Sequence, residues 1–72
     1  MPSKYPVVET RKLIAILHKK GFYDVSQKGS HKKLSDGNHI VIVPMHEQVM
    51  KGTLKSILNQ ADIELDEFLS LL

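Results

Sequence analysis

The sequence contains no cysteine. This absence excludes disulfides, cysteine-based zinc sites, iron–sulfur clusters and thiol nucleophiles, and it suits a reducing compartment. Long hydrophobic runs are missing too, because no stretch approaches the roughly 20 apolar residues that cross a bilayer. Charged residues also interrupt the first 20 positions, where a signal peptide would need an apolar segment. We therefore expect a soluble cytoplasmic protein that makes no use of a membrane.

The rest of the composition is typical of one small folded domain. The chain has 72 residues and a mass of 8.2 kDa, and 42% of its residues are hydrophobic and 25% charged. Domains run from roughly 50 to 250 residues, so a second one does not fit. Since no internal repeat, linker or low-complexity segment interrupts the chain, we predict a single domain over residues 1–72.

Charge is distributed unevenly along the chain, although the net charge is only +2. Residues 1–33 hold eight basic and two acidic residues, a net charge of +6, whereas residues 34–72 hold two basic and six acidic residues, a net charge of −4. A basic surface of this kind attracts polyanions. Nucleic acid is therefore the first candidate partner, against the alternative that the charges only solvate the surface.

The N-terminal part predicts an extended segment followed by a helix. Residues 1–9 contain Pro2 and Pro6 and no helical pattern, which favours an extended lead-in. Thr10 is a candidate cap for a helix over residues 11–20, and Gly21 follows where a helix commonly stops. The apolar face of this helix comprises Leu13, Ile14, Ile16 and Leu17.

Three short strands are predicted next. Lys28-Gly29 provides the first turn, Asp36-Gly37 is a strong hairpin signal, and Pro44 ends the last strand. If Asp36-Gly37 forms a two-residue turn, Leu34 pairs with His39. The predicted strands cover residues 22–27, 30–35 and 38–43, and they form a three-stranded antiparallel meander.

Two further helices are predicted in the acidic half. Thr53 is a candidate cap for the first, the second starts at about Glu64, and each has apolar residues at helical spacing. The two stripes are Leu54, Ile57, Leu58 and Ala61, and Leu65, Phe68, Leu69 and Leu72. The order α-β-β-β-α-α predicts an α+β fold in which the helices cover one face of the sheet and leave the other open. This is the outline of a double-stranded-RNA-binding-like fold.

Histidines are the side chains of this sequence that titrate near neutrality when unperturbed, so acid–base chemistry starts with them. His31 begins the second strand, next to Gly29 and Ser30 and among Lys28, Lys32 and Lys33. Side chains alternate along a strand, so His31 faces outward if Leu34 faces the helices. An outward histidine among lysines is placed to meet a phosphate, although an ordinary exposed strand histidine fits the same pattern.

The other histidines carry weaker signals. His18 is expected on a helix surface, and His39 at the start of a strand is expected to be structural or solvated. His46 begins the loop before the next helix, where it is either a plain loop residue or an auxiliary group near the edge of the sheet. The four have no i, i+4 pair and no acidic companion at ligand spacing, so no metal site is predicted.

Six motifs resemble those of the HicA (YcfA-like) toxins, small mRNA interferases of prokaryotic toxin–antitoxin pairs. The resemblance extends over nearly the whole chain, and its specificity comes from the order and spacing of the motifs. They are PVV (residues 6–8), KGF (20–22), QKGSH (27–31), VPMH (43–46), KGTLKSIL (51–58) and EFL (67–69).

The resemblance implies a double-stranded-RNA-binding-like fold, cleavage of mRNA, and a HicB antitoxin that covers the active surface. It also implies that the histidine of Gly-Ser-His, here His31, is catalytic. Because RNA carries its own nucleophile in the 2′-hydroxyl, a single histidine could serve without a metal or other cofactor. We expect Lys28, Gly29, Ser30, Lys32 and Lys33 to bind the RNA.

Two other interpretations of the sequence lead to different functions. A non-catalytic RNA-binding module of the same fold needs a lysine cluster at the start of the second helix, where only Lys51 and Lys55 stand. A pure interaction domain would use its open sheet face to bind protein. The predicted turn also puts Ile40 and Ile42 on the face of His31, which suggests that an antitoxin contacts one or both of them. A three-residue turn would put Val41 and Val43 on that face instead.

Overall fold

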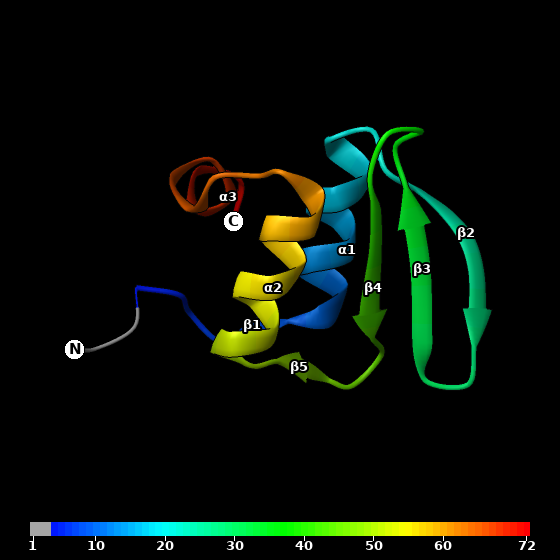
Figure 1. Cartoon of the computed structure of the whole chain (residues 1–72). Coiled ribbons are helices and arrows are strands. Elements are labelled where there is room, and N and C mark those ends of the chain that lie inside the picture. Colours follow the sequence, from blue (N-terminus) through cyan, green and yellow to red (C-terminus); the bar gives the residue numbers. More distant parts are fainter. Residues whose placement is uncertain (1–3) are drawn as a thin grey trace.

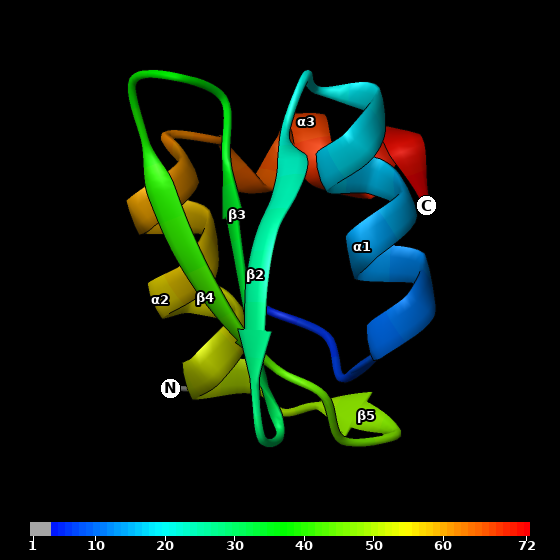
Figure 2. The same ribbon diagram turned by 90° about the vertical axis from the view of Figure 1, so that its right-hand side faces the viewer.

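The computed structural model of the chain describes residues 4–72, which form two antiparallel sheets and three helices (Figure 1 and Figure 2). Residues 1–3 of the predicted lead-in, Pro2 among them, lie outside the described residues. Across residues 4–72, no helix is long and apolar enough to span a membrane. The elements are β1 (Val8–Glu9), α1 (Thr10–Lys19), β2 (Tyr23–Lys28), β3 (His31–Ser35), β4 (Ile40–Pro44), β5 (Gln48–Val49), α2 (Lys51–Ala61) and α3 (Leu65–Leu71).

The predicted meander is confirmed, because β2, β3 and β4 form one antiparallel sheet in that order. Leu34, Val41 and Val43 point from β3 and β4 into the core and are fully buried, because α1 and α2 lie on that side. Figure 1 shows β4 beside the helices and β2 farthest from them. The prediction of an α+β fold with an α-β-β-β-α order is therefore confirmed.

The core is built by the periodic apolar residues that predicted the helices. The stripes of α1 and α2 are buried in full, and at roughly 25 cal/mol per Å² such burial is the main favourable term in folding. The stripe of α3 is confirmed only in part: Phe68 is fully buried and Leu65 packs against the core, whereas Leu69 and Leu72 are exposed. The last helix thus covers one end of the core with a narrow contact.

Both predicted threonine caps are wrong. The N-cap of α1 is Glu9 and that of α2 is Met50, and neither cap forms a side-chain hydrogen bond to its helix. Thr10 and Thr53 lie inside the first turns instead. Each helix begins directly after a strand of the second sheet, so the pairing of those strands sets where the helix starts.

That second sheet was not predicted. β1 pairs with β5 through Val8↔Val49 and Glu9↔Gln48, so the predicted lead-in and the predicted loop meet. Two-residue strands are too short to show the alternation by which a strand is recognised. Val8 and Val49 are both buried, and the pairing fixes the chain directly after the loop over residues 45–47.

The register of the β3–β4 hairpin differs from the prediction by two residues. Leu34 pairs with Val41 and not with His39, and the connection is a four-residue loop. The Asp36 carboxylate closes this loop by accepting hydrogen bonds from the backbone N–H groups of Asn38 and His39. Because side chains alternate with a period of two, a shift of two residues leaves every side chain on its predicted face.

Candidate functional site

The site lies at the end of the sheet where β2 turns into β3. Lys28 pairs with His31, so Gly29 and Ser30 form a two-residue hairpin turn. Gly29 has a φ of +60°, in the left-handed region that such turns require and that side chains with a Cβ rarely adopt. The turn was predicted one residue earlier, over Lys28-Gly29. The observed turn leaves Lys28 in β2 and places His31 as the first residue of the central strand.

The sheet face turned away from the core, called here the outer face, gathers His31, Lys28 and Lys33. Lys28 shares the face with His31 because the two are cross-strand partners, and Lys33 shares it because it lies two residues further along β3. All three side chains are exposed. In residues 4–72 neither lysine makes an ion pair, so the positive charge of this face is not neutralised from within the described chain.

Lys32 does not join this group. Its side chain points to the opposite side of the sheet, where its Nζ lies 3.1 Å from Oδ2 of Asp24 and only 19% of the side chain is exposed. Nε2 of His18 lies 2.8 Å from the other oxygen of the same carboxylate. The hydrogen bond with His18, followed by that from Lys32, lowers the pKa of Asp24 below its usual value. Lys32 therefore helps to tie β2 and β3 to the end of α1.

His39 lies at the other end of the sheet, in the loop before β4 and not at the start of a strand as predicted. Its Nδ1 is 3.0 Å from Oδ2 of Asp36, in the loop between β3 and β4. Hydrogen bonds from the ring and the backbone of this loop lower the pKa of Asp36 to about 2. Of the two alternatives expected for His39, structural or solvated, this contact favours the structural one. It holds His39 away from the turn that carries His31.

A loop over residues 45–47 borders the site and joins it to α1. The Met45 N–H donates a hydrogen bond of 2.6 Å to the carbonyl oxygen of Ser30, the residue before His31. Thr10 holds the next two residues, because its hydroxyl donates to the carbonyl of His46 and its N–H donates, at 3.0 Å, to that of Glu47. The loop is therefore fixed at both ends.

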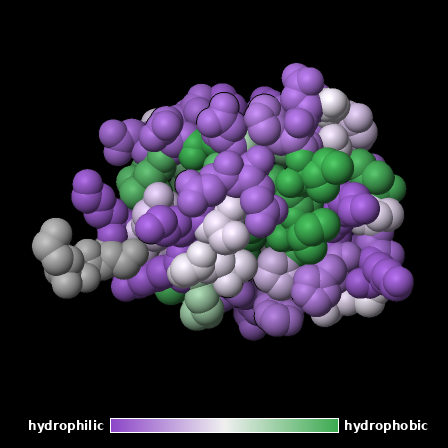
Figure 3. Space-filling view, viewed as in Figure 1, coloured by the Kyte–Doolittle hydropathy of each residue, from purple (hydrophilic) through white to green (hydrophobic). Residues whose placement is uncertain are grey.

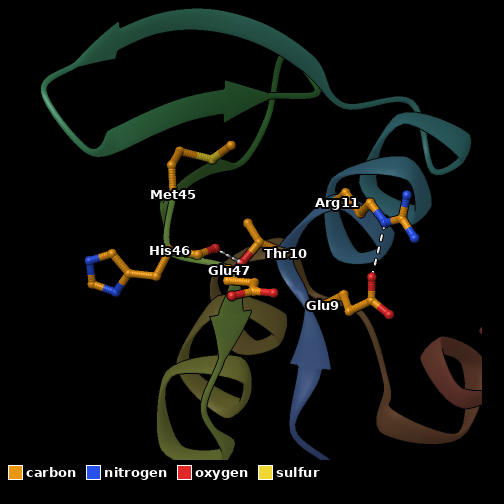
Figure 4. A pocket seen from close by; sticks show the side chains of 6 residues that line it. All are labelled: Glu9, Thr10, Arg11, Met45, His46 and Glu47. Atoms are coloured by element: carbon orange, nitrogen blue, oxygen red, sulfur yellow. Dashed lines mark hydrogen bonds and ion pairs between the residues drawn. The ribbon is translucent and has the colours of Figure 1, made fainter.

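A cavity of about 450 Å³ lies between this loop and the start of α1. Figure 4 shows the side chains that line it, with the Thr10 hydroxyl directed to the His46 backbone and the imidazole of His46 pointing away from Thr10. The lining residues are Glu9, Thr10, Arg11, Met45, His46 and Glu47. An ion pair of 2.9 Å between Glu9 and Arg11 neutralises two of its charges.

Apolar side chains adjoin the basic group on the outer face. Ile40 is 58% exposed and Ile42 is 39% exposed, and the latter pairs with Lys33 across the sheet. Figure 3 shows a hydrophobic area over the strands, bordered by hydrophilic side chains. The expectation that both isoleucines face outward with His31 is confirmed, because Val41 and Val43 take the inward positions.

Thr10 is the site residue that the sequence did not reveal in its observed role. It is the one buried polar residue among those described, yet its sequence position suggested a helix cap. Its partners are the backbone carbonyls of His46 and Glu47, far along the chain. Every residue has a backbone carbonyl, so the sequence does not show which of them is the acceptor. The pairing of Lys32 with Asp24 was equally hidden, because several carboxylates could have met that lysine.

Comparison with known families adds one finding. The family model described as the HicA toxin of bacterial toxin–antitoxin systems matches residues 10–63, which include every strand of the main sheet and the loop over residues 45–47. A search of curated proteins gave no match. The match covers His31 and its turn as well as His46.

Proposed function

Because the chain belongs to the HicA family of toxins from bacterial toxin–antitoxin systems, we propose that it is an endoribonuclease that cleaves mRNA with His31. A HicB-like antitoxin protein holds it inactive by covering the outer face. The observation that carries this proposal is the exposed His31 between Lys28 and Lys33, on a face whose lysines have no carboxylate partner within residues 4–72.

The chemistry follows from what RNA itself supplies. Its 2′-hydroxyl is a built-in nucleophile, so the protein must provide proton transfer and charge stabilisation. His31 transfers a proton, either from the 2′-hydroxyl or to the departing 5′-oxygen, which is worth about 10²- to 10⁴-fold in rate. Lys28 and Lys33 stabilise the negative charge that grows on the phosphate. No step in this scheme calls for a metal ion, and cleavage is expected to continue in the presence of a chelator.

RNA contacts are expected to be mainly electrostatic. The outer face offers two lysines and few aromatic rings for stacking a base, so recognition depends on phosphates more than on sequence. Gly29 and Ser30 add the backbone of an exposed turn next to His31. Lys32 is left out of this set, because it is bound to Asp24 on the other side of the sheet.

Replacing Lys28 and Lys33 together with Ala should weaken RNA binding and flatten its salt dependence. For a single strand, each lysine–phosphate interaction that is removed reduces the slope of log affinity against log salt by about 0.7. Lys32→Ala is the matched control, since it removes the same charge from the neighbouring position but from the opposite face. Fluorescence anisotropy over a salt series measures the RNA affinity of each variant and its salt dependence. A control that flattens the slope as much as the double variant would place the RNA elsewhere.

A further inference from the structure

Two of the four histidines are bound to carboxylates, and two are not. His18 is paired with Asp24 and His39 with Asp36. Within residues 4–72, the imidazoles of His31 and His46 make no hydrogen bond or ion pair, and both residues are exposed. The two histidines that remain available for chemistry are the two nearest the turn between β2 and β3.

The backbone brings these two residues to the same end of the main sheet. His31 pairs with Pro44, and the hydrogen bond from Met45 to Ser30 extends this antiparallel register by one step. β4 ends at Pro44 and the chain bends at His46, so His46 lies one residue past the point where the loop is hydrogen-bonded to the turn that carries His31. Met45 packs against the core, and the next side chain, that of His46, is exposed.

The position of His46 is also well fixed for a loop residue. The hydroxyl of the buried Thr10 holds its carbonyl, and the Thr10 N–H holds the carbonyl that follows. A side chain on a doubly anchored backbone needs little reorganisation to reach a bound phosphate. The charged groups around it are Glu47 next in the chain and, in the same cavity, the paired Glu9 and Arg11.

The reaction itself requires two proton transfers at different places. In an in-line displacement, the attacking 2′-oxygen and the leaving 5′-oxygen lie on opposite sides of the phosphorus. One imidazole beside the phosphate can reach one of these oxygens at hydrogen-bond distance, about 2.8 Å, but not both. A second group on the far side would let both oxygens exchange protons in the same step.

Resting on the proposed function, we propose that His46 is the second catalytic residue and that His31 and His46 divide the two proton transfers between them. The bond from O2′ to phosphorus forms while the bond from phosphorus to O5′ breaks. One imidazole takes the proton of the 2′-hydroxyl, and the other gives its proton to O5′. The products are a 2′,3′-cyclic phosphate and a 5′-hydroxyl, and exchange with solvent restores the two imidazoles.

The test compares His46→Gln with the parent on RNA under single-turnover conditions. Loss of one proton transfer should slow cleavage by about 10²-fold or more. His39→Gln is the matched control, because it removes a histidine at the other end of the sheet, and it should cleave at the parental rate. Binding of each variant to an uncleavable 2′-deoxy strand reports that the variant is folded and engages nucleic acid.

A second substrate separates proton donation from binding. When sulfur replaces O5′ at the scissile position, the leaving group departs as a thiolate without being protonated, because a thiol is far more acidic than an alcohol. On this substrate, only one of the variants His31→Ala and His46→Gln should regain most of the cleavage rate that it lost on RNA. The histidine missing from that variant is then the proton donor. Cleavage of RNA by His46→Gln at the parental rate would overturn the assignment of His46. Slow cleavage by both variants would also overturn it if the sulfur substrate restored the rate of both variants or of neither. A parent that does not cleave RNA at all would overturn the proposed function instead.

Discussion

His31→Ala is expected to lose at least about 10²-fold in cleavage rate while the protein stays folded. The loss follows from removing a group that transfers a proton in the transition state. Stability should remain within about 0.5 kcal/mol of the parent, the usual range for surface substitutions, because the side chain is exposed and makes no hydrogen bond within residues 4–72. Chemical denaturation and single-turnover cleavage of one preparation measure both quantities.

The variant also separates catalysis from binding. Lys28 and Lys33 are unchanged in it, so its affinity for RNA and for the antitoxin should be close to that of the parent. His18→Ala is the matched control. It makes the same substitution, but the histidine that it removes is paired with Asp24 on the other side of the sheet. If folded His31→Ala cleaves at the parental rate, the proton transfer belongs to another group and our assignment of the site fails.

Replacing Ile40 and Ile42 together with Ala should weaken binding of the antitoxin by about 10²-fold. Buried apolar anchors at an interface typically contribute about 1–2 kcal/mol or more each. Both isoleucines are exposed on the outer face, Ile42 as the partner of Lys33 and Ile40 two residues further from His31. An antitoxin segment that covers them also lies against Lys33, the cross-strand partner of Ile42, so we expect it to carry acidic residues next to its apolar ones.

Leu72→Ala is the matched control for the isoleucine pair. Leu72 is 53% exposed, similar to Ile40, but it follows α3, away from the outer face. The control should bind the antitoxin as the parent does, and the double variant should still cleave RNA, which shows that its sheet is intact. Titration calorimetry with purified antitoxin gives both affinities. Unchanged affinity of the double variant together with weaker binding of Leu72→Ala would place the interface elsewhere.

Periodic patterns predicted the parts of the fold that depend on burial. Leu34 had to face the helices, and this alone put His31 and Lys33 on the open side of β3. The faces of Ile40 and Ile42 were also predicted correctly although the hairpin register was wrong, because the error was an even number of residues. The candidate catalytic face could therefore be drawn from the sequence.

What the sequence left open are contacts decided by three-dimensional packing. Thr10 meets a loop that lies 36 residues further along the chain, and Lys32 meets Asp24 across two strands. In both cases the residue type is compatible with several partners, and only the folded arrangement selects one. The position of the loop over residues 45–47, and with it the neighbourhood of His46, depends on such contacts.

The most direct test of the central claim is the fate of an RNA with one 2′-deoxy nucleotide at its cleavage position, incubated with the purified chain and a chelator. We predict that the all-ribose strand is cleaved to a 2′,3′-cyclic phosphate and a 5′-hydroxyl, and that cleavage at the deoxy position is abolished because the nucleophile is gone. Equal cleavage of the two strands, or products with a 5′-phosphate, would show that water attacks the phosphorus and would contradict the account.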